Sequence, residues 1–575
     1  MPSLLQQARA LKQHERQAQI EALSAVYSAP LSDKEEKIHA LPLARLVSEC
    51  SSGAVAPRDV LSAYGKKTLA AQRLTNCISD FMFDEALDIP AFAEYSSAGE
   101  SDTGSSSASL RPCPLLGVPV SLKDTVDIAG HDSTMGFARH VGHPAAASAP
   151  LVRMLQDAGA ILHAKTTVPT GLLAIETASD TFGHTANPHN TGHSVGASTG
   201  GGGALVACGG SVVEIATDLA GSARIPAHFC GVWGLKGSSG RFPTWGTGTS
   251  MPGLETVPIL AAPMARSLAD LEEFWRRIVS MKPWTYDFTC APLPWQKVDL
   301  LVEGRKLKWG VIWQDGVTEP TPACRRSLSL VINALKAQGH EVVDFTPPNI
   351  SELLTVGYQL VFADGGAQIR DACLPGEQLN APLKGTIDLV RLPRLLKRLL
   401  AYWSRAKDPY YASLLDAMHP TTVLEERALV VRRDALRAAW HARWAAEHLD
   451  FVLTVPHPLP ALETGTGARA SLISSGYTFL FSMLDYVAGV LPVTTVDKAA
   501  DALPADFLSS AKFNAMNSVG QGVWSVYDAE KMHGLPLGVQ IAGRRLEEEK
   551  VLEGMKVIEA ALRQAGTPFV PKALV

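Results

Sequence analysis

A glycine-rich stretch in the middle of the chain places the strongest limit on what it can fold into. Residues 192–240 read GHSVGASTGGGGALVACGGSVVEIATDLAGSARIPAHFCGVWGLKGSSG, and most of them are small. A backbone with so few bulky side chains can turn sharply and approach a ligand closely. The stretch therefore predicts a binding region held between regular elements.

Short apolar runs alternate with helical segments on both sides of this stretch. Leu115 to Leu122 reads as a buried strand that ends at Lys123, and further strands are predicted at 160–165, 212–216, 308–312, 341–345 and 451–455. A helix is predicted at 147–158, and residues 183–203 are predicted to form a polar loop. Such alternation is typical of an α/β protein with a central sheet.

The domain organisation follows from the two ends of the chain. Residues 1–75 have helical spacing of apolar side chains, and residues 94–110 are rich in serine and glycine, which indicates a loop. No similar linker follows residue 110. We therefore expect an N-terminal helical extension over 1–90 and one large domain over 91–575.

Charge and cysteine content exclude several classes of function. The formal net charge of the 575 residues is -5, which gives no overall positive field for nucleic acid. Eight scattered cysteines contain no C-x-x-C pair, which argues against a disulfide scaffold or a structural zinc. The apolar stretches 204–217 and 478–495 are shorter than the roughly 20 residues of a membrane span, and each contains an acid. We expect a cytoplasmic protein.

Three polar residues are candidates for chemistry. Lys123 lies at the end of a predicted buried strand, where desolvation lowers a lysine pKa and favours a neutral base; the alternative is an ordinary surface lysine. Ser222 follows Leu219-Ala220-Gly221 and opens a helix-like run, where backbone amides bind a developing oxyanion; the alternative is a plain N-cap. Ser198 lies within the glycine run.

Two overlapping G-x-S-x-G matches, at 192–196 and 196–200, lie in the same run. The nucleophile elbow of an α/β-hydrolase requires a hydrophobic strand directly before it. Residues 185–191 are instead loop-like, and the run lacks the G-K-[ST] of a phosphate loop. Both of these interpretations are disfavoured.

The segments taken together resemble the amidase signature family. The matching pieces are Gly117-Val118-Pro119 with Lys123-Asp124, then 196–201 (GASTGG), then 216–227 (ATDLAGSARIPA), with the two serines 24 positions apart. Segments 484–486, 491–496 and 543–549 are similar to the eukaryotic branch, which contains fungal acetamidase-like enzymes and the fatty acid amide hydrolases.

The resemblance implies a central mixed, twisted sheet covered by helices on both faces, with N-terminal helices and a helical cap. It also implies that the domain over 91–575 is catalytic and that the helical cap is inserted in it at 384–446. The chemistry that the resemblance implies requires no metal or cofactor.

The resemblance also implies a mechanism. Ser222 would attack the carbonyl, Ser198 would relay the proton across a cis peptide, and neutral Lys123 would be the base. The amides of Leu219, Ala220, Gly221 and Ser222 would form the oxyanion hole. The residues expected to hold the surrounding loops are Thr199, Asp218 and Arg224.

Substrate and partners remain open at this stage. Leu172, Leu173, Ile175 and Phe362 fall where that branch lines its acyl pocket, so an apolar acyl group is expected, with small amides and carbamates equally allowed. Segment 384–407 is amphipathic and basic, which indicates either a membrane-surface helix or a cap that packs on the core or on a second subunit of a homodimer. A subunit of a tRNA-dependent amidotransferase and a catalytically silent binding protein are the other hypotheses.

Overall fold

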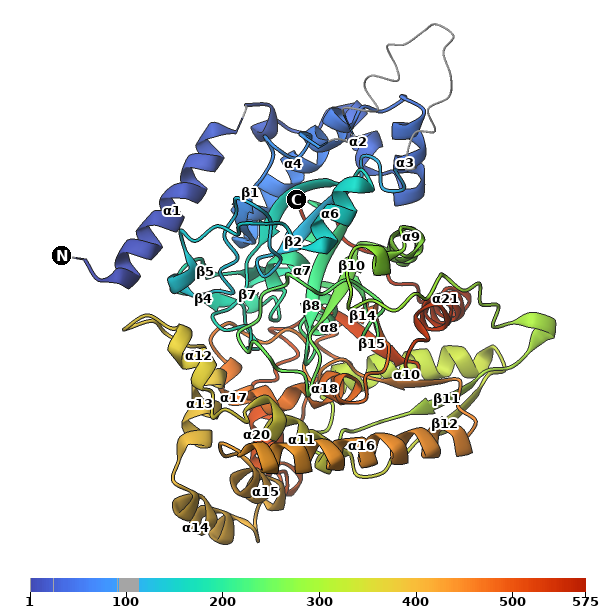
Figure 1. The fold of residues 1–575 in the computed structure, drawn as a ribbon. Helices are drawn as coiled ribbons and strands as arrows, with labels where there is room; N and C mark the ends of the chain where they lie inside the picture. The colour runs from blue at the N-terminus through green and yellow to red at the C-terminus, as the bar shows by residue number, and fades with distance from the viewer. Residues whose placement is uncertain (1, 24, 90–91, 93–112) are drawn as a thin grey trace, which may run out of the picture.

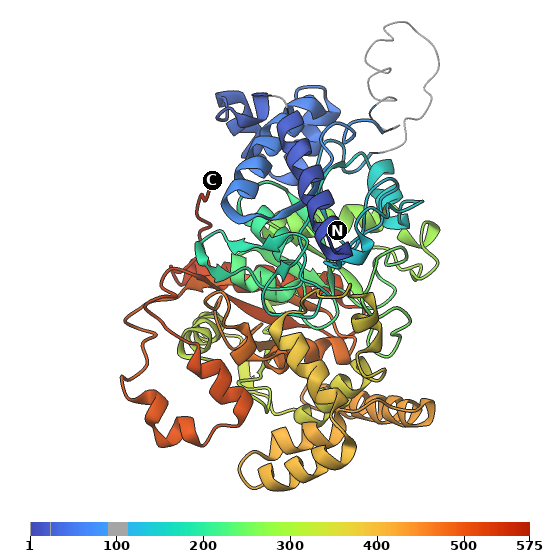
Figure 2. The same cartoon turned by 90° about the vertical axis from the view of Figure 1, so that its left-hand side faces the viewer.

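The computed structural model describes residues 2–23, 25–89, 92 and 113–575, and Figure 1 presents the fold. The predicted loop at 94–110 lies outside the described residues. The prediction of helices in the first 75 residues is confirmed, with four α-helices: α1 (Leu4–Ala22), α2 (Asp33–His39), α3 (Leu43–Ser51) and α4 (Pro57–Thr75). Both views place them together at one end of the molecule (Figures 1 and 2).

Eleven strands of the described residues form one central sheet. Their order across it is β1 (Ile78–Phe81), β3 (Ile161–Thr166), β2 (Pro119–Lys123), β8 (Val213–Asp218), β10 (Leu260–Ala265), β9 (Trp233–Lys236), β14 (Ala488–Thr495), β15 (Pro536–Ala542), β13 (Phe451–Thr454), β11 (Lys308–Val311) and β12 (Glu341–Asp344). Strands β3, β2 and β8 run parallel, as do β13, β11 and β12, and the strands between β8 and β13 pair antiparallel. The expected mixed sheet is confirmed, and all six predicted strands belong to it.

Helices cover both faces of the sheet. On one face α7 (Gly200–Ala207) contacts β2, β3, β8 and β10, while α8 (Arg224–Cys230) contacts β9, β14 and β15. On the other, α9 (Leu268–Ser280) contacts β8 to β10, and α21 (Glu548–Gln564) contacts β14 and β15. Side chains alternate accordingly along β10: Ala262 and Met264 pack with α7 and α8, whereas Ala261 and Ala265 join the larger core.

The prediction of a polar loop over 183–203 is partly wrong. It contains the short strands β5 (Gly183–His184), β6 (Ala186–Asn187) and β7 (Asn190–Ser194), with β4 (Ala178–Ser179) paired to β5. Helix α7 already begins at Gly200. Glycine is a poor helix former. Tertiary packing nevertheless requires glycine at position 202 of α7, because a Cβ on Gly202 would lie 2.4 Å from Cδ of the buried Glu214.

The remaining helices lie mainly at the opposite end from α1–α4 (Figure 2). They are α6 (Pro150–Asp157), α10 (Pro322–Ala337), α11 (Ile350–Val361), α12 (Ala367–Ala372), α13 (Ala381–Arg391), α14 (Arg394–Ser404), α15 (Pro409–Ala417), α16 (Val423–Ala446), α17 (Gly467–Ala470), α18 (Gly476–Met483), α19 (Ala511–Asn514) and α20 (Ser518–Ser525). Of these, α6 instead packs beside β3 near the N-terminal helices.

Segment 384–407 is not one continuous helix, as its apolar stripe had suggested. It divides into α13 and α14 at Pro393, which stands at the N-cap of α14. Proline lacks an N–H and disfavours a helical residue before it, and Leu392 accordingly has ψ 140°. Within the described residues, no helix combines the length and apolarity that crossing a membrane would require.

Candidate active site

The predicted base Lys123 is the last residue of β2, and its side chain is fully buried. Its Nζ donates hydrogen bonds to Ser198 Oγ at 2.8 Å and to Thr217 Oγ1 at 2.8 Å, with the Thr217 carbonyl at 3.3 Å. The surface-lysine interpretation is therefore wrong. Ser198 is also buried, and the peptide bond between Ala197 and Ser198 is cis, as the resemblance implied.

Burial also decides the charge state of the amine. Desolvation lowers the pKa of Lys123 to about 7, against the opposing attraction of Asp218, Glu214 and Asp124. A large fraction of Lys123 is thus neutral near neutral pH and has a lone pair to accept a proton. Glu214 is itself a buried carboxyl on β8, where Thr166 Oγ1 donates to it at 2.6 Å and Ser121 Oγ donates to its other oxygen.

Asp218 builds the turn that presents Ser222. Its carboxylate accepts from the Gly221 amide at 2.8 Å and from the Ala223 amide at 3.1 Å. It also forms a fully buried ion pair with Arg224 at 2.8 Å. This pair is the main favourable cause that lowers the pKa of Asp218 to about 2, despite burial. The carboxylate therefore stays ionised and holds both sides of the nucleophile turn.

Backbone contacts join the two serine segments. The Thr199 amide donates to the Ser222 carbonyl at 3.0 Å, so the residue after Ser198 is tied to the proposed nucleophile. Gly221 has φ +122°, and a Cβ there would lie 2.2 Å from Thr478 Oγ1. Only glycine fits this turn without strain. Thr199 supports the loop through its backbone, because its hydroxyl has no hydrogen-bond partner among the described residues.

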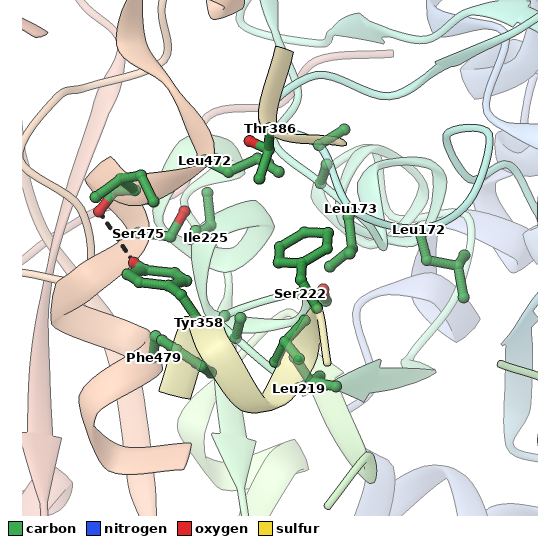
Figure 3. A pocket seen from close by; sticks show the side chains of 17 residues that line it. Leu172, Leu173, Leu219, Ser222, Ile225, Tyr358, Thr386, Leu472, Ser475 and Phe479 are labelled. Carbon is green, nitrogen blue, oxygen red and sulfur yellow. Dashed lines mark hydrogen bonds between the residues drawn. The ribbon is translucent and has the colours of Figure 1, made fainter. Parts of the chain in front are cut away.

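Ser222 lies on the wall of a small apolar cavity with a volume of about 40 Å³ (Figure 3). Leu172, Leu173 and Phe362, predicted from the resemblance, line it. The other lining residues are Ala174, Ala197, Leu219, Ala220, Gly221, Ile225, Tyr358, Val361, Thr386, Leu472, Ile473, Ser475 and Phe479. Ile175 does not line it; that side chain packs in the core.

Several of these residues were not foreseen from the sequence. Thr217 precedes Asp218 in the motif already quoted, so a signal for it existed. Tyr358, Thr386 and Ile473 come from segments far along the chain that carry no recognisable pattern. Within the part of the chain that the structure describes, no group of three His, Cys, Asp or Glu side chains is arranged to hold a metal ion.

Comparison with known proteins agrees with this geometry. A family model described as Amidase matches residues 59–552. Fatty-acid amide hydrolase 1 of Sus scrofa is 33% identical over 540 residues, which cover 93% of this chain and 88% of that protein. An acetamidase of Aspergillus oryzae is 30% identical over 539 residues, covering 91% and 90%. A solved structure of a fatty acid amide hydrolase matches with a TM-score of 0.79 at 25% identity, covering 97% of this chain and 94% of that one.

Proposed function

Because the chain belongs to the amidase family and is an amide-hydrolysing enzyme, we propose that Ser222, Ser198 and Lys123 carry its reaction. The observation that supports this most is the 2.8 Å hydrogen bond from the buried Lys123 to Ser198, beside the cavity that Ser222 lines. This arrangement places a base of lowered pKa beside the hydroxyl that we assign as the proton relay to Ser222.

The proposed sequence of proton transfers starts from neutral Lys123. Lys123 accepts the proton of Ser198, Ser198 takes the proton of Ser222, and Ser222 Oγ forms a bond to the substrate carbonyl carbon. The resulting oxyanion is stabilised by backbone amides. The Gly221 amide donates to Asp218, so this role is assigned to the amides of Leu219, Ala220 and Ser222.

Collapse of the tetrahedral intermediate breaks the carbon–nitrogen bond. The departing nitrogen takes a proton from Ser198, which is replenished from Lys123, and an acyl-enzyme remains on Ser222. Water then attacks the acyl-enzyme with the same base, releasing the carboxylic acid and restoring Ser222. The same steps can be written for the carbonyl carbon of a carbamate, so a carbamate is the alternative substrate class.

The substrate is proposed to carry an apolar acyl group, since the cavity beside Ser222 is lined mainly by hydrocarbon. Two similar proteins are named for different acyl lengths, a fatty-acid amide hydrolase and an acetamidase. Measuring kcat/KM over acyl p-nitroanilides from acetyl to long-chain, with ethyl carbamate beside them, decides between them. A rise with length identifies a lipid-amide enzyme, and a flat or falling series a small-amide or carbamate hydrolase.

We further propose that α14 contacts a lipid surface. The helix exposes Leu395 (73%), Leu399 (51%) and Trp403 (78%), whereas its Lys397 is 1% exposed. The Lys397 Nζ caps the helix ends on either side by donating to the carbonyls of Val390 and Met418.

Because the buried Lys397 anchors one side of α14, the side with Leu395, Leu399 and Trp403 faces outward. The basic residues in and beside this helix favour binding to an anionic membrane. These are Arg391, Arg394, Arg398 and Arg405, all exposed. Arg394 and Arg405 also form ion pairs with Glu425 and Asp416, at 3.0 and 2.6 Å. Such contact is reversible, and it agrees with the cytoplasmic location predicted from the sequence.

A further inference from the structure

We propose that Thr386 and Ile473 form a partition that limits the length of the acyl group accepted above Ser222. This inference rests on the proposed function, because it assumes that the acyl group lies in the cavity that Ser222 lines. It follows from a second cavity, with a volume of about 320 Å³, that shares these two residues with the first. The two cavities therefore adjoin at Thr386 and Ile473.

The outer cavity lies between α13, α15, α17 and α20. Its lining residues beyond the shared pair are Ala381, Pro382, Gly385, Leu389, Tyr411, Leu414, Met418, Ala468, Ser471, Ser518 and Val519. Ala381, Gly385 and Ala468 are exposed, so this cavity reaches the protein surface. The inner cavity is lined mostly by buried side chains.

Each partition residue is held by its own element. Thr386 is 8% exposed and lies on α13, where its hydroxyl donates to the Pro382 carbonyl at 2.9 Å. Ile473 is 7% exposed and lies on a 3₁₀ turn, Leu472–Ser475, and the Tyr358 hydroxyl donates to its carbonyl at 3.1 Å. The Thr386 hydroxyl is occupied by a backbone carbonyl, and the Ile473 side chain is hydrocarbon. Both side chains therefore present hydrocarbon to the cavities.

The position of Thr386 in the cavity explains how the partition would limit the length of the acyl chain. In Figure 3, Thr386 and Leu472 lie at one edge of the inner cavity and Leu219 at the opposite edge, with Ser222 between them. An acyl chain bound to Ser222 that extends toward α13 meets Thr386 and Ile473 before it can reach the outer cavity. Added methylenes gain burial up to this wall and gain nothing beyond it.

The test measures kcat/KM for straight-chain acyl p-nitroanilides from two to sixteen carbons. We expect the wild-type value to rise about fourfold per methylene and then to break at one chain length. The variants Thr386→Ala and Ile473→Ala should each move that break by two or more carbons, with every rate taken relative to the acetyl rate of the same variant. A cooperative thermal unfolding transition, measured separately, shows that each variant is folded.

Two matched controls separate the loss of the wall from the loss of the Thr386 hydroxyl and from changes in the outer cavity alone. Thr386→Val removes the hydroxyl but keeps the wall, so its break should stay at the wild-type length. Gly385→Ala adds a methyl to the outer cavity alone, where its Cβ has no atom within 4 Å, and it should also leave the break in place.

An unchanged break in both opening variants, or a wild-type series without any break, overturns the partition while leaving the amide hydrolase intact. Absence of Ser222-dependent hydrolysis across the whole series would instead refute the proposed function itself. The two failures are therefore distinguishable in one data set.

Discussion

Lys123 Nζ lies 2.8 Å from Ser198 Oγ at the end of β2, in a site where both side chains are buried. A lysine in this position is shielded from solvent, which disfavours its charged form. The charged amine donates to the Ser198 hydroxyl and to the Thr217 hydroxyl and carbonyl. When the amine is neutral, its lone pair can accept from the Ser198 hydroxyl, which is the direction that the proposed relay requires.

The pH dependence of hydrolysis should follow Lys123. Burial lowers its pKa to about 7, and only the neutral amine accepts a proton, so kcat/KM should rise with pH through about 7 and level above it. The ionised form of Glu214 raises the pKa of Lys123, and burial raises the pKa of Glu214 itself to about 7. Glu214 is therefore partly ionised where Lys123 titrates, and in Glu214→Gln the rising part of the pH profile should move to lower pH.

A matched control for this shift is Glu341→Gln at an exposed position of β12, which should leave the rising part of the pH profile unchanged. If the rising part also stays at its wild-type pH in Glu214→Gln, it does not reflect the titration of Lys123.

Thr217 should behave as a positioning residue for the base. Its hydroxyl accepts from Lys123 at 2.8 Å, and it does not line the cavity. Thr217→Val should lower kcat about tenfold, or ~1.4 kcal/mol, with KM nearly unchanged. Thr217→Ser, which keeps the hydroxyl, should restore most of the rate. Wild-type activity of Thr217→Val would show that Thr217 does not position the base.

The Asp218–Arg224 pair should matter for stability as well as activity. Both side chains are fully buried, so Arg224→Met leaves an uncompensated carboxylate and should lower the free energy of unfolding by ~3–5 kcal/mol. Urea unfolding at pH 7 measures this loss.

The pH dependence of that stability has a definite sign. The pKa of Asp218 is lowered to about 2 in the folded protein, against about 3.9 in an unfolded chain. Its contribution is therefore present above about pH 4 and is lost as the pH falls toward 2. Unfolding free energies of Arg224→Met that match wild type at pH 7 would contradict a stabilising pair.

Lipid binding by α14 should depend on its exposed apolar side chains. The triple variant Leu395→Ser, Leu399→Ser, Trp403→Ser should lose co-sedimentation with vesicles of anionic phospholipid. A matched control replaces Leu424 and Val431, which are 78% and 72% exposed on α16, with serine and should bind as wild type does. Undiminished binding by the triple variant would exclude this face. A lipid-free dimer that only the triple variant abolishes would assign the face to a second copy.

Much of the proposed catalytic site was predictable, because its residues lie in local motifs. Lys123 ends a short apolar strand run, and Ser198, Asp218 and Ser222 lie within one small-residue stretch. Parallel pairing of β2 with β8 then brings their ends together. The sequence indicated which side chains meet, although the assignment of their roles came from the resemblance to a family.

The cavity walls and two local structures were not predictable in the same way. Thr386 and Ile473 are ordinary residue types brought to Ser222 only by tertiary packing. Helix α7 begins with glycines whose propensity favours a loop, and contact with Glu214 decides otherwise. Pro393 did carry a local signal for the break in 384–407, but the apolar spacing on both of its sides continues as if the helix were uninterrupted.

The central claim, that Ser222 is the nucleophile activated through Ser198 and Lys123, is tested most directly by covalent labelling. Intact-mass and peptide analysis after reaction with a serine-directed alkyl fluorophosphonate should give one adduct per chain, on Ser222. Ser222→Ala should give none, and Ser198→Ala and Lys123→Ala should label at least a hundredfold more slowly while remaining folded. Stoichiometric labelling of a different residue, or a wild-type labelling rate in Lys123→Ala, would contradict the account.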